Sequence, residues 1–138
     1  MPDTEPSPLR RPGDRLDLSI ADDPRIVRRI RLVIAESVAD LVPLPKLTDV
    51  VIVVSELVSN AIKHGDEPRH LRLSVDETAL AIEITDGGSG GGAVTDLVGR
   101  GGHGRRVVEM LSTEWGAASD DGGTRVWARI AIPAIRAS

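Results

Sequence analysis

Alternation of apolar and polar residues marks several short segments of the chain as strands with one buried face. The first is 16–20, where every second residue is leucine or isoleucine. Segments 71–75 and 80–84 show the same alternation and are separated by the polar turn 76–78, so they predict a hairpin. Two further strands, with a turn at a glycine pair between them, are predicted between 115 and 132.

The segment after the first strand has the periodicity of an amphipathic helix. Asp22 or Asp23 can cap this helix, with Pro24 in its first turn. The residues that share its predicted buried stripe are Ile26, Ile30, Val33, Ser37, Val38 and Leu41. A helix is therefore expected to follow the first strand directly.

A second helix is predicted over 46–64, after Pro43 and Pro45 break the chain, and Gly65 is expected to end it. Its buried face, at helical spacing, consists of Val50, Val54, Leu57, Val58 and Ala61. A short third helix is predicted over 105–111, between the hairpin and the last two strands. The helices thus fall into a pair and a single element.

The predicted order is strand, two helices, two strands, a long loop, a helix and two strands. Strands in consecutive hairpins with the helices gathered together favour an α+β two-layer sandwich. We expect a mixed, mostly antiparallel sheet with the helices packed on one face. Residues 1–13 include four prolines and few apolar residues, and are expected to be a disordered leader to one domain over 14–138.

Composition narrows the classes of function. The length of 138 residues and 41% hydrophobic content suit one domain with a real core, and the net charge of −4 argues against a nucleic-acid partner. The absence of cysteine excludes disulfides, thiol catalysis and cysteine-ligated zinc. No apolar run has the length of a membrane span and no signal peptide is visible, so we expect a cytoplasmic protein with no membrane partner.

Glu56 and Asn60 form the first candidate site. Their spacing of four residues places them side by side on the second predicted helix, away from its main apolar stripe. An asparagine carbonyl suits Mg²⁺, and a carboxylate can take a proton from an attacking hydroxyl. His64 continues this line, but an asparagine stands where a zinc helix has a histidine, which argues against zinc. An ordinary exposed polar face is the alternative.

The second candidate site is the run Asp86-Gly87-Gly88-Ser89-Gly90, directly after a predicted strand. A carboxylate offers acceptors only, so at this place it would favour an exocyclic amine such as that of adenine. The glycines would let a ligand approach the backbone closely. The same run is also a strong turn signal, and an ordinary turn is the alternative.

The third candidate site is a glycine-rich stretch that leads into the short helix. Nine of the fourteen glycines lie between Gly87 and Gly104, a density typical of a mobile lid or of a flexible connection. Backbone amides at a helix start suit phosphate. No Lys-Ser/Thr pair follows as in a P-loop, and the βαβ frame of a Rossmann fingerprint is missing.

Together, these motifs resemble the Bergerat nucleotide-binding fold of the histidine-kinase-like ATPases. The run 55–65 resembles their N-box, Asp86 to Gly90 their first glycine box, and 102–104 their second. Gly123-Thr124 sits where the family has its adenine-side threonine. The resemblance covers about residues 16–132. Among sensor histidine kinases, type II topoisomerases, heat-shock chaperones and anti-sigma-factor serine kinases, the chain looks most like the last group.

The resemblance implies a role for each motif residue, with ATP and Mg²⁺ as cofactors. Glu56 would be the catalytic base, Asn60 would bind Mg²⁺ and the nucleotide, and Asp86 would hold the adenine amine with Thr124 nearby. The other implied ATP-binding residues are Lys63, His64, Gly88, Gly90, Gly102, His103 and Gly104. The basic pair at positions 63 and 64 could instead interact with the dipole of its helix.

The resemblance also implies an activity and partners. The chain is too short for the additional domains of topoisomerases and chaperones, and no histidine stands mid-helix as a phosphoacceptor. The leading hypothesis is an anti-sigma factor that phosphorylates serine or threonine on a STAS-domain anti-anti-sigma protein, binds a sigma factor and forms a homodimer. A nucleotide-dependent binding module with little kinase activity is the alternative, and a domain that has lost its nucleotide is a third.

Overall fold

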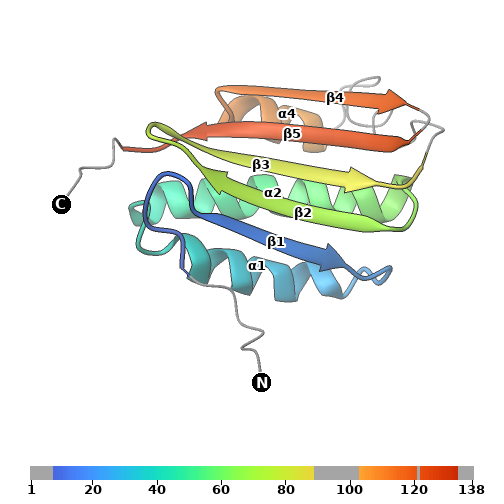
Figure 1. The fold of residues 1–138 in the computed structure, drawn as a ribbon, viewed down its shortest axis with the longest axis horizontal. Helices are drawn as coiled ribbons and strands as arrows, with labels where there is room; N and C mark the ends of the chain where they lie inside the picture. The colour runs from blue at the N-terminus through green and yellow to red at the C-terminus, as the bar shows by residue number, and fades with distance from the viewer. Residues whose placement is uncertain (1–7, 89–102, 121, 134–138) are drawn as a thin grey trace.

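The strands of the molecule form one sheet, and the helices cover one of its faces (Figure 1). The computed structural model describes residues 8–88, 103–120 and 122–133. The elements in chain order are β1 (Arg15–Ile20), α1 (Ile26–Val38), α2 (Leu44–His64), β2 (Arg69–Val75), β3 (Ala79–Asp86), α4 (His103–Leu111), β4 (Glu114–Asp120) and β5 (Gly123–Ala131). This order confirms the predicted succession of strands and helices.

The five strands lie in the order β1-β2-β3-β5-β4. All four neighbouring pairs are antiparallel, so the parallel component allowed for in the prediction does not occur among the described strands. Helix α2 packs against β3 and β5 at the centre of the sheet, with α1 and α4 on its two sides. The predicted α+β class, with helices on one face, is confirmed.

The core lies between α2 and the inner face of the sheet. Alternate residues of β2, β3 and β5 point toward the helices, as the period of two requires. The fully buried side chains of this layer include Leu71, Leu73, Leu80, Ile82, Ile84 and Ile130 from the sheet and Val50, Val53, Val54, Leu57 and Val58 from α2. Strand alternation and helical spacing thus meet in one apolar layer.

The helix ends differ in detail from the prediction. The prediction that Asp22 or Asp23 caps α1 is wrong: the N-cap is Arg25, with no side-chain hydrogen bond to the helix. Oδ1 of Asp23 accepts from the backbone N–H of Arg25 at 2.9 Å in the turn before the helix, and Asp22 pairs with Arg69. Pro45 does not break the chain but lies in the first turn of α2, where its missing N–H costs nothing. Leu41 is buried but follows the end of α1.

The outer face of the sheet is polar, with one aromatic contact. Asp17, Arg72, Glu83, Trp127 and Gly116 face one another in register across all five strands. Ion pairs join some of these strands, and a guanidinium from β5 lies 4.3 Å from the centre of the Trp127 ring. A side chain at Gly116 would collide with this ring, so glycine is required there.

In the described residues, no helix is long and apolar enough to cross a membrane.

A matched pair of leucines tests the core. Leu57 on α2 is 1% exposed and Leu32 on α1 is 62% exposed. We expect Leu57→Ala to lower the free energy of unfolding by about 2–5 kcal/mol, since it leaves a cavity in the core. Leu32→Ala should change it by less than about 0.5 kcal/mol. Urea unfolding measures both, and equal losses would contradict the packing described above.

Asp76, in the turn between β2 and β3, should make the stability of the fold depend on pH. The hydrogen bond from Arg129 holds the pKa of the Asp76 carboxyl below its usual range, and the backbone amides of Thr78 and Ala79 add to the effect. A lowered pKa in the folded state stabilises the fold above the usual aspartate pKa, and this stabilisation is lost as the pH falls below about 4. The stability difference between wild type and Asp76→Asn should therefore shrink from pH 6 to pH 3 in urea unfolding. A constant difference would exclude this contribution.

Candidate functional site

Helix α2 places Glu56 where α2 meets the start of α4, and Asn60 follows one turn later on the same helix. Asn60 is buried, with 8% of its surface exposed, and Glu56 is half-buried. A Cβ at Gly104, in the first turn of α4, would lie 2.7 Å from Oε2 of Glu56. Gly104 therefore leaves the space that the Glu56 carboxylate occupies, which brings the predicted N-box and the second glycine motif into contact.

Asp86 is the last residue of β3, and its carboxylate is buried between the end of α2 and the loop that follows β3. Oδ1 accepts a 2.7 Å hydrogen bond from the backbone N–H of Gly88 and a longer one, at 3.5 Å, from that of Asp66. A Cβ at Gly65 would lie 2.5 Å from Oδ2. The close approach of α2 to the carboxylate thus depends on a residue with no side chain.

Thr124 lies opposite Asp86 in the pairing of β3 with β5. It is 4% exposed, and its hydroxyl donates a 2.7 Å hydrogen bond to the carbonyl of Gly88. The side chains of Asp86 and Thr124 therefore hold the two backbone groups of Gly88 between them. Three of the predicted site residues come together here. Asp86 and Thr124 also line an open cavity of about 460 Å³ at the ends of β3 and β5, together with the outward-facing Thr85 and Arg125.

The remaining predicted residues have different outcomes. Lys63 is exposed in the last turn of α2 and lines a hollow of about 410 Å³ beside the start of α1, and His64 is half-buried at the same helix end. His103 begins α4, but its side chain is outside the described part of the structure. Gly90 and Gly102 also lie outside the described residues, as does most of the predicted lid.

Comparison with known proteins decides the family. Residues 20–130 match the family model for the histidine kinase-like ATPase domain, which is most of the chain. The chain belongs to this family. Among curated proteins, no sequence matches it.

The fold of this ATPase domain is similar to that in the crystal structure of the RsbU and RsbW domains of Rv1364c from Mycobacterium tuberculosis. The TM-score is 0.68, at 19% sequence identity. The match covers 92% of this chain and 35% of that one, so the chain spans about a third of the length of that structure. At this identity, the likeness shows a shared fold.

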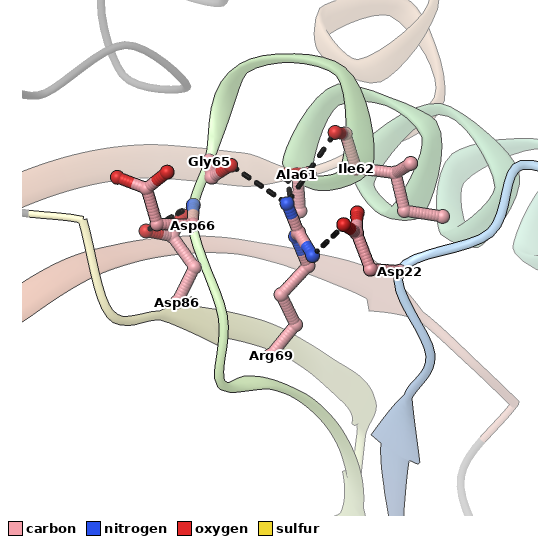
Figure 2. Close-up of polar contacts among 7 residues, drawn as sticks. All are labelled: Asp22, Ala61, Ile62, Gly65, Asp66, Arg69 and Asp86. Atoms are coloured by element: carbon pink, nitrogen blue, oxygen red, sulfur yellow. Dashed lines mark hydrogen bonds and ion pairs between the residues drawn. The ribbon is translucent and has the colours of Figure 1, made fainter.

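A buried arginine next to the site was not predicted from the sequence. Arg69, the first residue of β2, is 5% exposed. Its Nε donates to the carbonyl of Ala61 at 2.8 Å and its Nη2 to that of Gly65 at 2.7 Å, while Nη1 pairs with Asp22 at 3.0 Å (Figure 2). Arg69 thereby binds carbonyls at the end of α2, where few backbone N–H groups remain to pair with them; that of Ala61 also accepts from the N–H of Gly65 at 2.8 Å.

A signal for Arg69 does exist in the sequence. It stands two residues before Leu71, so it has the parity of the inward-facing residues of β2. A charged residue at a buried position needs a partner, and a helix C-terminus is one that suits a cation. The alternation by itself could not identify which carbonyls would face it, because they belong to a different element.

Two glycines with positive φ test the packing around Asp86. Gly123 has φ +138°, and a Cβ there would collide with the backbone carbonyl of Asp86, whereas Gly13 has φ +96° with no atom near. Gly13→Ala should cost only the backbone strain, about 1–2 kcal/mol. Gly123→Ala should cost more, since it adds a collision between strands. Equal costs in thermal unfolding would show that β5 can move away from Asp86 freely.

Proposed function

We propose that this ATPase domain is an anti-sigma factor with serine/threonine protein kinase activity. It would transfer a phosphoryl group from Mg-ATP to a STAS-domain anti-anti-sigma protein, and bind a sigma factor. The observation that supports this most is the convergence of Asp86, Gly88 and Thr124 at one edge of the sheet, next to the end of α2. The family match and the fold of an RsbW-containing structure support the same proposal.

The geometry around Asp86 suits the adenine end of a nucleotide. With Oδ1 bonded to the N–H of Gly88, the carboxylate has acceptor capacity left for an amino group. A keto oxygen at the same place would meet an acceptor, so guanine would be disfavoured. The hydroxyl of Thr124 donates its one proton to the carbonyl of Gly88, so it has acceptor capacity left beside the carboxylate. The side chains missing at Gly65 and Gly123 leave the space in which Asp86 is held.

In our proposal the chain supplies few of the ligands of a magnesium ion. Among the described residues, no three His, Cys, Asp or Glu side chains form a group that could hold a metal ion. Asn60 would supply a carbonyl oxygen to Mg²⁺, an ion that prefers oxygen ligands and keeps several waters. Bound in this way, Mg-ATP supplies the phosphoryl group and neutralises charge on it.

Glu56 is the proposed proton acceptor. Its carboxylate lies against the first turn of α4, where the backbone amides of a helix favour negative charge. From there, it can accept the proton of a serine or threonine hydroxyl as that oxygen attacks phosphorus. Lys63 and His64, in the last turn of α2, would contact phosphate or interact favourably with the negative end of the dipole of α2.

The wider assignments rest on the resemblance. A homodimer that binds a sigma factor and a STAS-domain protein is the assembly we propose, in the cytoplasm of a bacterial cell. Gly90, Gly102, Gly104 and His103 would line the nucleotide site with the glycine-rich stretch. No nucleic-acid or membrane partner is part of the proposal.

Calorimetric titration with ATP, with and without Mg²⁺, tests the nucleotide site. Asn60→Ala should weaken Mg-dependent binding about tenfold or more, because one ligand of the ion is lost, and Asp86→Asn should abolish binding. Glu83→Gln, on the opposite face of the same strand, is the matched control and should bind like wild type. If wild type gives no heat and no nucleotide raises its Tm, a protein-binding scaffold without nucleotide would be the better account.

Phosphotransfer from labelled ATP to a panel of STAS-domain proteins tests the kinase activity. Glu56→Ala should lower the rate by about a hundredfold or more, which is the usual contribution of a general base. Transfer that survives the substitution would remove Glu56 from the mechanism. Tight complexes with no transfer to any panel member would replace the kinase with a nucleotide-dependent binding module.

A further inference from the structure

The guanidinium of Arg69 is buried against the end of α2, where it has a function besides neutralising a carboxylate. Its one carboxylate partner among the described residues is Asp22, whose side chain is 55% exposed. The other acceptors are the carbonyls of Ala61, Ile62 and Gly65, at 2.8, 3.4 and 2.7 Å. Burying a cation is costly unless its donors are satisfied, and here most of the hydrogen bonds from the guanidinium go to backbone carbonyls. The arginine therefore fixes the path of the chain where α2 ends.

This path leads directly to Asp86. Gly65, whose carbonyl accepts the shortest hydrogen bond from Arg69, is also a residue at which an added Cβ would lie 2.5 Å from Oδ2 of Asp86, so there is no room for a side chain. The next residue, Asp66, donates its N–H to Oδ1 of Asp86 and accepts from the N–H of Gly87 at 2.9 Å. Figure 2 shows the two sets of contacts on either side of this short segment. The peptide group between Gly65 and Asp66 thus connects the guanidinium of Arg69 to the carboxylate of Asp86.

We infer that Arg69 is a positioning residue for base selection at the nucleotide site. It holds Gly65 and Asp66 against Asp86, and so fixes the place of the carboxylate oxygen that meets the exocyclic group of the base. An amino group and a keto oxygen are distinguished only if that oxygen stays in place, because a carboxylate that moves can leave room for water between it and guanine. This inference rests on the proposed function for the identity of the base, but the positioning itself concerns the free protein.

The chain offers a matched control on the same strand, β2. Arg72, three residues after Arg69 on β2, pairs with Asp17 of β1 at 2.7 Å. This pair also joins an arginine of β2 to an aspartate, but it lies exposed on the outer face of the sheet and does not contact α2. Comparing variants of Arg69 and Arg72 therefore separates the effect of removing an arginine from β2 from the effect of removing its contact with α2.

The first measurement compares ATP and GTP affinities by calorimetry in Arg69→Met, Arg69→Lys and Arg72→Met. Arg69→Met should lower the preference for ATP about tenfold, because Asp86 is no longer held, while Arg72→Met leaves it unchanged. Arg69→Lys keeps the charge but not the fork of donors, so the preference should be intermediate. Equal weakening of both nucleotides in Arg69→Met, or no change, would overturn the inference.

The second measurement needs no nucleotide. Amide hydrogen exchange in the free protein should become faster at Asp66, Gly87 and Gly88 in Arg69→Met, and not in Arg72→Met, while the β2–β3 ladder keeps its protection. If Arg69→Met does not fold, Arg69→Lys, which keeps the charge but loses the fork of donors to the carbonyls, gives the same test with Arg72→Lys as its control.

The two measurements separate the two proposals. If wild type binds neither nucleotide, the proposed function fails, and exchange at Gly87 and Gly88 still decides whether Arg69 positions the segment. If wild type prefers ATP but these amides exchange equally in the Arg69 and Arg72 variants, the proposed function stands and the positioning role is wrong.

Discussion

The antiparallel register of β3 and β5 is the constraint on which the rest of the molecule depends. Leu80 faces Ile130, Ile82 faces Ala128 and Ile84 faces Val126, and all six side chains point into the core. The next inward-facing pair along the same two strands is Asp86 and Thr124. The candidate site is therefore the last pair of the core, with polar residues in place of apolar ones. A slip of one residue in this pairing would expose the core and the site together.

Helix α2, in the other layer, also links the core to the candidate site. The face that packs on the sheet includes Leu57, Val58 and Ala61, and Glu56 lies beside it, against Gly104 of α4. Rotation of the helix is fixed by its apolar face, and the position of its end by the hydrogen bonds from Arg69. The packing of α2 on the sheet thus also orients Glu56 and Asn60.

Much of this arrangement was predictable, because it follows from patterns that are local in the sequence. The hairpin, the two long helices and the motif residues Asp86 and Thr124 came from alternation, helical spacing and resemblance. Helix ends were harder to place: Pro45 lies inside α2, since a proline in a first turn has the same sequence signal as a break. Arg69 was not predicted, because its partners are carbonyls of another element and have no signature in the sequence. The roles of all the candidate site residues stay predictions, and Gly90 and Gly102 also lie outside the described residues.

The two tryptophans lie on opposite faces of the same sheet. Trp115 of β4 packs against the core, 5.8 Å from the guanidinium of Arg105 at the start of α4, while Trp127 is stacked beneath Arg125 on the outer face. The chain has no tyrosine, so its ultraviolet fluorescence comes from these two indoles alone. Any movement of α4 away from the sheet changes the surroundings of one emitter and not the other. The protein thus has an intrinsic optical reporter of α4 with its own internal reference.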